Sequence, residues 1–299
     1  SISKPVGEGD WAAGYKAQLW LGPDANLLGT SSIGATFQDF AIKQAYVELR
    51  APLGTGLNIK LGVFNTPIGY ESADGPDNAN YTRSWGNTME PTQHTGILLS
   101  YRFNDMLSIS AGMANTVDPI INSRLATSAQ SQKAYMASVT FTAPDGAGFM
   151  KGATLSGGVV DGRTIAVGGA PDVTDIYVGG TMPLPVDGLA LGASFDHQNL
   201  NGATDRDAIA GYISYKINDK LKINARLDYY DDGAGVLFAP AGVEVITGTL
   251  TVDYALWENV ISRLEWRWDH DASNHKAMAS GGFARNNSQT IALNVVYKF

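Results

Sequence analysis

The four histidines of this chain are the residues best suited to act as a general base: His94, His197, His270 and His275. A serine-type hydrolase needs a hydroxyl within hydrogen-bond reach of the imidazole, and a third group that orients the ring. His94 and Ser100 are six positions apart in a predicted strand, which separates them by more than ~15 Å at ~3.3 Å per residue. No histidine lies in a G-x-S-x-G or H-E-x-x-H context. The sequence therefore predicts no catalytic residues.

Oxygen-bearing side chains follow one another closely in residues 74–80, which read Asp-Gly-Pro-Asp-Asn-Ala-Asn. Calcium loops use a comparable spacing of oxygen ligands. This segment contains Pro76 and lacks the downstream bidentate glutamate of an EF-hand, and the shorter run 231–233 is a weaker match. We interpret both as polar turns and expect no metal and no cofactor. The absence of cysteine excludes zinc and iron–sulfur sites built on thiolates.

Charged side chains recur at alternate positions rather than in clusters with catalytic spacing. In residues 221–229 every odd position is apolar and every even position is polar or charged, and residues 263–269 show the same alternation. Successive side chains of a strand point to opposite faces of a sheet, so each segment has one apolar and one polar face. The charges are therefore expected to line a surface.

The alternation predicts fourteen strands. Most run about ten to thirteen residues, whereas soluble strands average ~5–6 and a tilted strand that crosses a bilayer needs ~9–11. The predicted strands span 11–22, 38–51, 56–66, 92–103, 105–116, 132–143, 150–161, 173–182, 188–199, 206–217, 219–231, 243–254, 258–270 and 288–299.

The connections between these strands alternate between short and long. Every short connection follows an even-numbered predicted strand and is rich in Asn, Asp, Gly or Pro, as tight turns are. Short turns on one side and long loops on the other are typical of transmembrane β-barrels. Both termini then lie on the short-turn, periplasmic side, and residues 1–10 form a periplasmic lead-in. The long loops centre on 23–37, 67–91, 117–131, 162–172, 200–205, 232–242 and 271–287.

Composition narrows the class of protein further. The chain has 299 residues, a net charge of −8 and no cysteine, and it contains no run of the ~18 apolar residues that a membrane-spanning helix needs. An acidic chain is poorly suited to nucleic acid, whose phosphates require a basic surface. The sequence begins at Ser1 rather than at a methionine, which weakly suggests a processed, exported protein.

Aromatic residues gather near the ends of the predicted strands, as in the two girdles of a barrel in the outer membrane. The chain also ends on an alternating strand whose last residue is Phe299, which resembles the C-terminal signal that the barrel-assembly machinery recognises. Hydrocarbon satisfies no backbone polar group, so a membrane sheet must close. We predict an all-β protein: one antiparallel transmembrane β-barrel over residues 1–299, with 14 strands (12 or 16 as alternatives), in the bacterial outer membrane. The girdle residues are Trp11, Trp257, Trp266, Trp268, Tyr297 and Phe299.

A resemblance to a known family appears within residues 62–118. Residues 62–71 read Gly-Val-Phe-Asn-Thr-Pro-Ile-Gly-Tyr-Glu, and they are followed by Asn-Tyr-Thr-Arg-Ser at 80–84 and His-Thr-Gly at 94–96. This pattern resembles the OmpL-like family of β-barrel porins in Gram-negative bacteria and covers about a fifth of the chain in recognisable motifs. The resemblance implies an outer-membrane porin, and it carries over no catalytic residue.

A barrel of fourteen strands leaves a lumen wide enough for small solutes unless a loop fills it. Loop 67–91, the longest, is expected to fold inward as a constriction and carries Glu71, Asp74, Asp77, Arg83 and Glu90. Both signs of charge line the predicted wall, which indicates weak ion selectivity of unassigned sign. Lys43 falls on the outward side, so it sits at the interface or marks a bulge or a misread register. The predicted pore-lining residues are Lys16, Tyr46, Glu48, Arg50, Lys60, Arg102, Asp175, Asp196, Lys222, Arg226, Asp228, Asp253, Arg263, Glu265 and Arg267.

The function predicted from these features is passive diffusion of small polar solutes or ions through a water-filled channel. The alternatives are a substrate-specific channel, a non-conducting structural or partner-binding barrel, an outer-membrane hydrolase and a soluble β-sandwich. The expected partners are outer-membrane lipids, permeating solutes, the barrel-assembly machinery and a second copy of the chain in a homo-oligomer, with no nucleic acid.

Overall fold

The computed structural model describes residues 1–22, 25, 40–119, 132–164, 172–201, 204–238, 240–280 and 283–298. Nearly all regular structure in these ranges is β-strand. Three single-turn 3-10 helices also occur: η1 (Gly75–Asp77), η2 (Gly86–Thr88) and η4 (Gly148–Met150). Within these ranges we find no helix with the length and apolar character needed to span a membrane.

All fourteen predicted strands are confirmed, each with boundaries within four residues of the prediction. They are β2 (Ala13–Leu21), β3 (Phe40–Ala51), β4 (Leu57–Asn65), β5 (Gln93–Arg102), β6 (Leu107–Ala114), β7 (Ala134–Thr142), β8 (Thr154–Arg163), β9 (Asp172–Pro183), β10 (Leu189–Leu200), β11 (Arg206–Lys216), β12 (Leu221–Asp232), β13 (Val243–Trp257), β14 (Val260–Asp271) and β17 (Asn287–Tyr297). Three short strands were not predicted: β1 (Ile2–Lys4), β15 (Met278–Ser280) and β16 (Phe283–Arg285).

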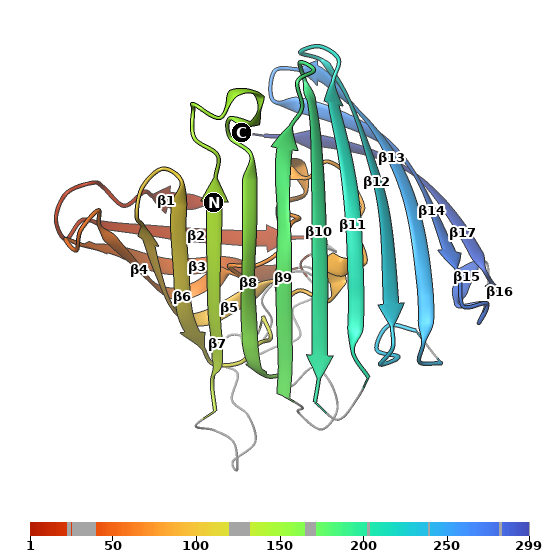
Figure 1. Cartoon of the computed structure of the whole chain (residues 1–299), viewed down its shortest axis with the longest axis horizontal. Helices are drawn as coiled ribbons and strands as arrows, with labels where there is room; N and C mark the ends of the chain where they lie inside the picture. The colour runs from red at the N-terminus through yellow and green to blue at the C-terminus, as the bar shows by residue number, and fades with distance from the viewer. Residues whose placement is uncertain are drawn as a thin grey trace.

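The fourteen long strands and the short strand β1 form one antiparallel sheet in chain order, from β1 through β14 to β17 (Figure 1). Within the lead-in predicted at residues 1–10, residues 2–4 form β1 and pair with residues 15–17 of β2. Strands β15 and β16 form a separate hairpin within the connection between β14 and β17. Among the described residues no pairing joins β17 to β1 or β2, so closure of the sheet stays a prediction.

The two faces of the sheet differ as the alternation predicted. One face exposes large apolar side chains, among them Leu227 (63% exposed) and Ile291 (76%), while the opposite face buries charged ones such as Arg226 (2%) and Glu265 (1%). A soluble protein arranges its faces the other way, because apolar surface is costly to expose to water. The arrangement matches a sheet with an apolar lipid-facing exterior and a polar interior. We call the second face the inward face.

The short connections join the strands at one end of the sheet, which we call the turn end. The long connections join them at the opposite end, which we call the loop end. Two turns show why they are so short. The side-chain oxygen of Asn104 accepts the backbone N–H groups of Met106 and Leu107, and Asn218 does the same for Lys220 and Leu221. An asparagine that accepts hydrogen bonds from the residues after it folds the chain back locally.

The bulge considered for Lys43 is present. The register between β2 and β3 shifts between Gln18 and Leu19, so that Lys43 is the extra residue on β3. The shift turns its side chain to the inward face, where it is fully buried, with Nζ 2.5 Å from the Asp74 carboxylate and 4.7 Å from the centre of the Trp20 ring. One inserted residue reverses which face a side chain occupies.

The aromatic residues predicted as girdles occupy different heights. Trp11, Trp257 and Tyr297 lie at the turn end, and all three are strongly exposed. Trp266 lies in the middle of β14, opposite Leu250 and Ile291, so it does not fit the strand-end position assigned to it. Trp268 lies two residues nearer the loop end, with its indole N–H bonded to Asn287, and Phe299 is outside the described residues.

Candidate channel constriction

The connection between β4 and β5, residues 66–92, begins and ends at the loop end but folds inward (Figure 1). Its neck is closed by a hydrogen bond from the Thr66 N–H to the Thr92 carbonyl (3.0 Å). Side chains of its first limb then lie against β8 to β11. Tyr70 stacks on Tyr212 with ring centroids 4.3 Å apart, and its hydroxyl hydrogen-bonds to Thr181 (2.9 Å). Side chains of loop 67–91 thus contact residues of β9 and β11.

Glycines on the facing strands make this approach possible. A Cβ atom on Gly192 of β10 would lie 1.8 Å from the Tyr70 hydroxyl, and one on Gly158 of β8 would lie 2.7 Å from Ile68 Cγ2. Contacts below 3.0 Å cannot persist without movement, so a larger residue at either position would push the loop away from the wall. The bare backbone of two strands thus forms notches for two loop side chains.

Arg226 on β12, the strand next to β11, forms a further set of contacts with the loop. Its guanidinium pairs with Asp228 (2.9 Å) and with Glu71 of the loop (3.1 Å), and it donates hydrogen bonds to the carbonyls of Thr82 (2.7 Å) and Arg83 (2.9 Å). Arginine suits this role because its planar group presents five donors in fixed directions. A single buried side chain therefore holds both limbs of the loop.

Neighbouring strands repeat the same chemistry. Glu265 on β14 accepts the backbone N–H groups of Tyr81 (2.6 Å) and Thr82 (2.9 Å). Arg263 pairs with Asp253 (2.9 Å) and donates to the carbonyls of Gly75, Pro76 and Asn78. Arg267 pairs with Asp269 (2.8 Å) and donates to the Arg83 carbonyl (2.7 Å). The charged side chains of β14 thus bind backbone groups of the loop.

The tip of the loop contacts residues near both edges of the sheet. Asp74 pairs with Lys43 on β3, and Asp77 pairs with Lys298, one residue past the end of β17 (2.8 Å). The two carboxylates that suggested a calcium loop are therefore each engaged by a lysine. No group of three or more potential metal ligands occurs in the described part of the chain.

Glu90 on the returning limb faces other acids. Burial and the nearby Asp196 carboxylate raise the pKa of Glu90, which is hydrogen-bonded to Asp196 and accepts a hydrogen bond from Asn87 (3.0 Å). Gly69 lies beside it with a φ of +110°, a left-handed conformation that favours glycine, and a Cβ atom there would be 2.5 Å from a Glu90 oxygen. Glu90 thus occupies a tight site in which its neutral form is favoured.

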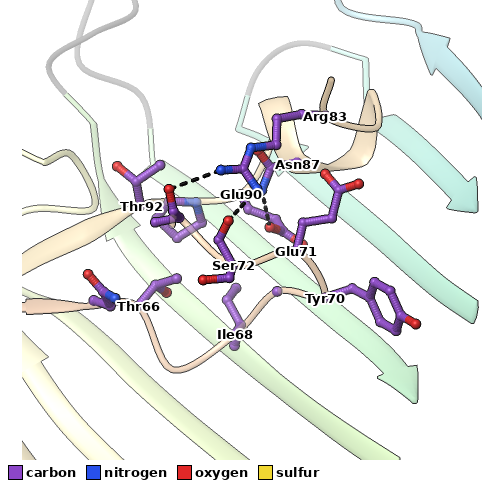
Figure 2. A pocket seen from close by; sticks show the side chains of 13 residues that line it. Thr66, Ile68, Tyr70, Glu71, Ser72, Arg83, Asn87, Glu90 and Thr92 are labelled. Atoms are coloured by element: carbon purple, nitrogen blue, oxygen red, sulfur yellow. Dashed lines mark hydrogen bonds between the residues drawn. The ribbon is translucent and has the colours of Figure 1, made fainter. Parts of the chain in front are cut away.

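Two cavities adjoin this returning limb. A cavity of about 210 Å³ lies between the two limbs, bounded by Glu71, Ser72, Arg83 and Glu90 (Figure 2). A second, of about 520 Å³, lies toward the loop end and is lined by residues at the loop-end termini of β6, β8, β9, β10 and β11. Both cavities are lined by Arg83, Asn87, Glu90, Pro91 and Thr92. The returning limb therefore separates space inside the loop from space open toward the loop end.

The fifteen predicted pore-lining residues all lie on the inward face, but they divide into two groups. One group is engaged with partners: Asp175, Asp196, Arg226, Asp228, Asp253, Arg263, Glu265 and Arg267. The other lies toward the turn end, below the loop: Lys16, Tyr46, Glu48, Arg50, Lys60, Arg102 and Lys222. Sequence reasoning missed the loop anchors Lys43, Tyr70 and Tyr212, and only the irregular register at Lys43 gave a signal.

The histidines form hydrogen bonds with nearby polar side chains. His94 is buried on β5 with Nε2 hydrogen-bonded to Thr66 (3.1 Å), while Ser100 hydrogen-bonds to Ser110 (2.9 Å). His197 pairs with Asp207 (2.9 Å), and the ring of His275 is hydrogen-bonded to the Ser273 hydroxyl (2.9 Å).

A single curved antiparallel sheet with an apolar exterior and an infolded long loop is the architecture of an outer-membrane porin. Solved structures agree. The chain resembles an anion-selective porin from Comamonas acidovorans (TM-score 0.66, 15% identity, 99% of this chain and 87% of that one) and OmpF of Salmonella typhi (0.65, 12%, 99% and 87%). It also resembles the outer-membrane channel DcaP of Acinetobacter baumannii (0.62, 15%, 99% and 83%).

The family model described as "Putative beta-barrel porin-2, OmpL-like" matches residues 1–299, so the chain belongs to the OmpL-like β-barrel porins. Membership confirms the resemblance drawn from residues 62–118 and places the protein in the bacterial outer membrane as a channel for small solutes. No curated protein sequence matches the chain significantly.

Proposed function

We propose that the protein is a passive-diffusion porin in which loop 67–91 forms the constriction of the channel. The observation that carries this proposal is the attachment of the loop to the inward face on several sides: Tyr70 against β10 and β11, Arg226 from β12, and Arg263 from β14. A loop held in this way narrows the passage at a fixed height. Solutes would reach it through the 520 Å³ cavity at the loop end.

The test is conductance of the purified, folded chain in planar lipid bilayers, compared with a variant in which residues 68–90 are replaced by a short glycine-serine turn. The Thr66–Thr92 hydrogen bond brings the two ends of the deletion together, so the turn can join them. Wild-type protein should give discrete channels, and the variant should conduct several-fold more. Equal conductance would refute the constriction, and the absence of channels in both proteins would refute passive diffusion.

A second candidate is a non-conducting barrel that binds a partner or serves as a scaffold. It is favoured by one observation: the loop contacts Lys43 on β3 and Lys298 after β17, as well as the wall of β12 to β14. A loop with so many attachments could fill the interior rather than narrow it. The same experiment separates the two functions, because a plugged barrel conducts only after the loop is removed.

The remaining parts of this proposal concern partners and chemistry. The exposed apolar face requires outer-membrane lipid around it, and insertion of such a sheet requires the barrel-assembly machinery. Some structural relatives are trimers, as the trimer form of OmpT of Vibrio cholerae illustrates, and we propose a homo-oligomer for this chain. We assign no enzymatic activity to it.

A further inference from the structure

The charged side chains of the inward face differ in their ion pairing between the loop-end part and the turn-end part. In the part nearer the loop end, two arginines form ion pairs and also donate to carbonyls of the loop. Arg226 on β12 pairs with Asp228 and Glu71, and Arg267 on β14 pairs with Asp269. A paired charge exerts little force on an ion that passes several ångströms away, because the two members of the pair act oppositely. Arg226 and Arg267 therefore contribute little net positive charge to the field that a permeating ion meets at this height.

The part nearer the turn end carries cations of a different kind. Within the described residues, Lys16, Arg50, Lys60, Arg102 and Lys222 form no ion pair on this face. We call these five residues the basic vestibule. All five side chains are at least partly exposed, in contrast to the fully buried Arg226.

Two of these lysines share one aromatic neighbour. Lys16 on β2 is directly opposite Tyr46 on β3, and Lys60 on β4 places its Nζ 4.9 Å from the centre of the same ring. A ring face attracts a cation without neutralising its charge. Tyr46 therefore positions the ammonium group of Lys60, whose charge stays available to solute, and Lys16 lies across from the same residue in the sheet.

Few acids oppose the basic vestibule. Glu48 is the one carboxylate on the described inward face of β2 to β5, and it lies opposite Lys60. On the far side, Asp253 lies opposite Lys222, but Arg263 and Asn224 already bind its two oxygens (2.9 and 3.1 Å). Five cations and one unengaged carboxylate leave this part of the interior with net positive charge.

We infer that the basic vestibule makes the channel prefer anions, so that small carboxylate- or phosphate-bearing solutes are its favoured substrates. The inference rests on the proposed diffusion function and supplies the sign of selectivity that the sequence left open. Several like charges around a narrow aqueous space raise the local concentration of counter-ions, and the effect weakens with salt because the Debye length falls from ~30 Å at 0.01 M to ~3 Å at 1 M. Rings of charged side chains select ions in other pores by the same principle.

The test measures reversal potentials across a bilayer in a potassium chloride gradient at low salt. We expect wild-type protein to pass chloride over potassium by about threefold or more, and the triple variant K16Q/K60Q/K222Q to approach a ratio of about one. The matched control is K151Q, which removes the same charge from an exposed side chain in the β7–β8 turn, paired with Asp145. It should keep the wild-type ratio. Heat-modifiable migration on a gel verifies that each variant is folded.

The outcomes separate the inference from the proposed function. A conducting wild-type protein with a ratio at or below one, or a triple variant with the wild-type ratio, overturns the inference and leaves the diffusion function intact. If no current is seen, the diffusion function fails, and calorimetric titration of the folded chain with sodium tripolyphosphate decides the inference. We then expect at least tenfold weaker binding by the triple variant than by wild type and K151Q, whereas equal binding by all three overturns it.

Discussion

Replacing Arg226 with alanine should release the constriction loop from the wall of the barrel. The side chain pairs with two carboxylates, Asp228 and Glu71, and donates to the carbonyls of Thr82 and Arg83. Removing one member of a buried ion pair typically costs ~3–5 kcal/mol, because the partner is left buried without a countercharge. At ~1.4 kcal/mol per factor of ten, the ratio of released to attached loop should rise by between about a hundredfold and a few thousandfold.

Tryptic cleavage after Arg83, followed by mass spectrometry of the folded protein, measures this release. Cleavage tracks the population of the open form when opening and closing are fast, so the R226A variant should be cut far faster than wild type, with a larger single-channel conductance. The matched control is R163A, whose arginine pairs with Asp172 at an exposed site (2.9 Å). Exposed pairs contribute ~0–1 kcal/mol, so R163A should behave as wild type. Unchanged cleavage and conductance in R226A would refute the role of Arg226 as the anchor.

Three further changes test other contacts of the loop. In E265Q one of the two oxygens that accept the Tyr81 and Thr82 N–H groups is replaced by a donor, so loop attachment should weaken by ~1–3 kcal/mol. Faster hydrogen exchange of those two amides measures this change, and unchanged exchange contradicts the role of Glu265 as their acceptor. G192A should displace the Tyr70 hydroxyl and weaken attachment by ~1–3 kcal/mol, whereas G157A, with its nearest atom at 3.4 Å, should not; equal effects in a conductance assay argue against the notch. Because the pKa of Glu90 is raised in the folded protein, its stabilising contribution is complete at low pH and is lost as pH rises through that raised pKa. Loop release should therefore increase toward alkaline pH, and E90Q, which stays neutral, should remove this dependence; a pH profile identical in both proteins would exclude Glu90 as its source.

The strands could be predicted because each carries its own signal. Alternation in residues 221–229 depends only on the two faces of a strand, so β12 was found without knowledge of its neighbours. Asn104 and Asn218 likewise fold their turns through local hydrogen bonds. The inward position of loop 67–91 followed from its length, its aromatic residues and the motif it carries.

The partners within the constriction could not be predicted in the same way. Arg226 and Arg263 were expected to line open water, but each donates hydrogen bonds to backbone carbonyls of the loop, and every residue has a carbonyl. Lys43 was assigned to the outward face because a one-residue bulge reverses the alternation without leaving a mark in composition. The closing of a sheet between its first and last strands also has no local signal.

The distances along the chain between the loop and its anchors have a consequence for assembly. Arg226 is 144 positions from Thr82, and Arg263 is 188 positions from Gly75. Contacts between residues so far apart form late in folding, because chain entropy must be lost before they contribute. Loop 67–91 emerges early in synthesis but gains these anchors only once β12 and β14 have joined the sheet. The proposed narrowing of the pore would therefore be a late event of its maturation, and a barrel arrested before that point would be the leakier one.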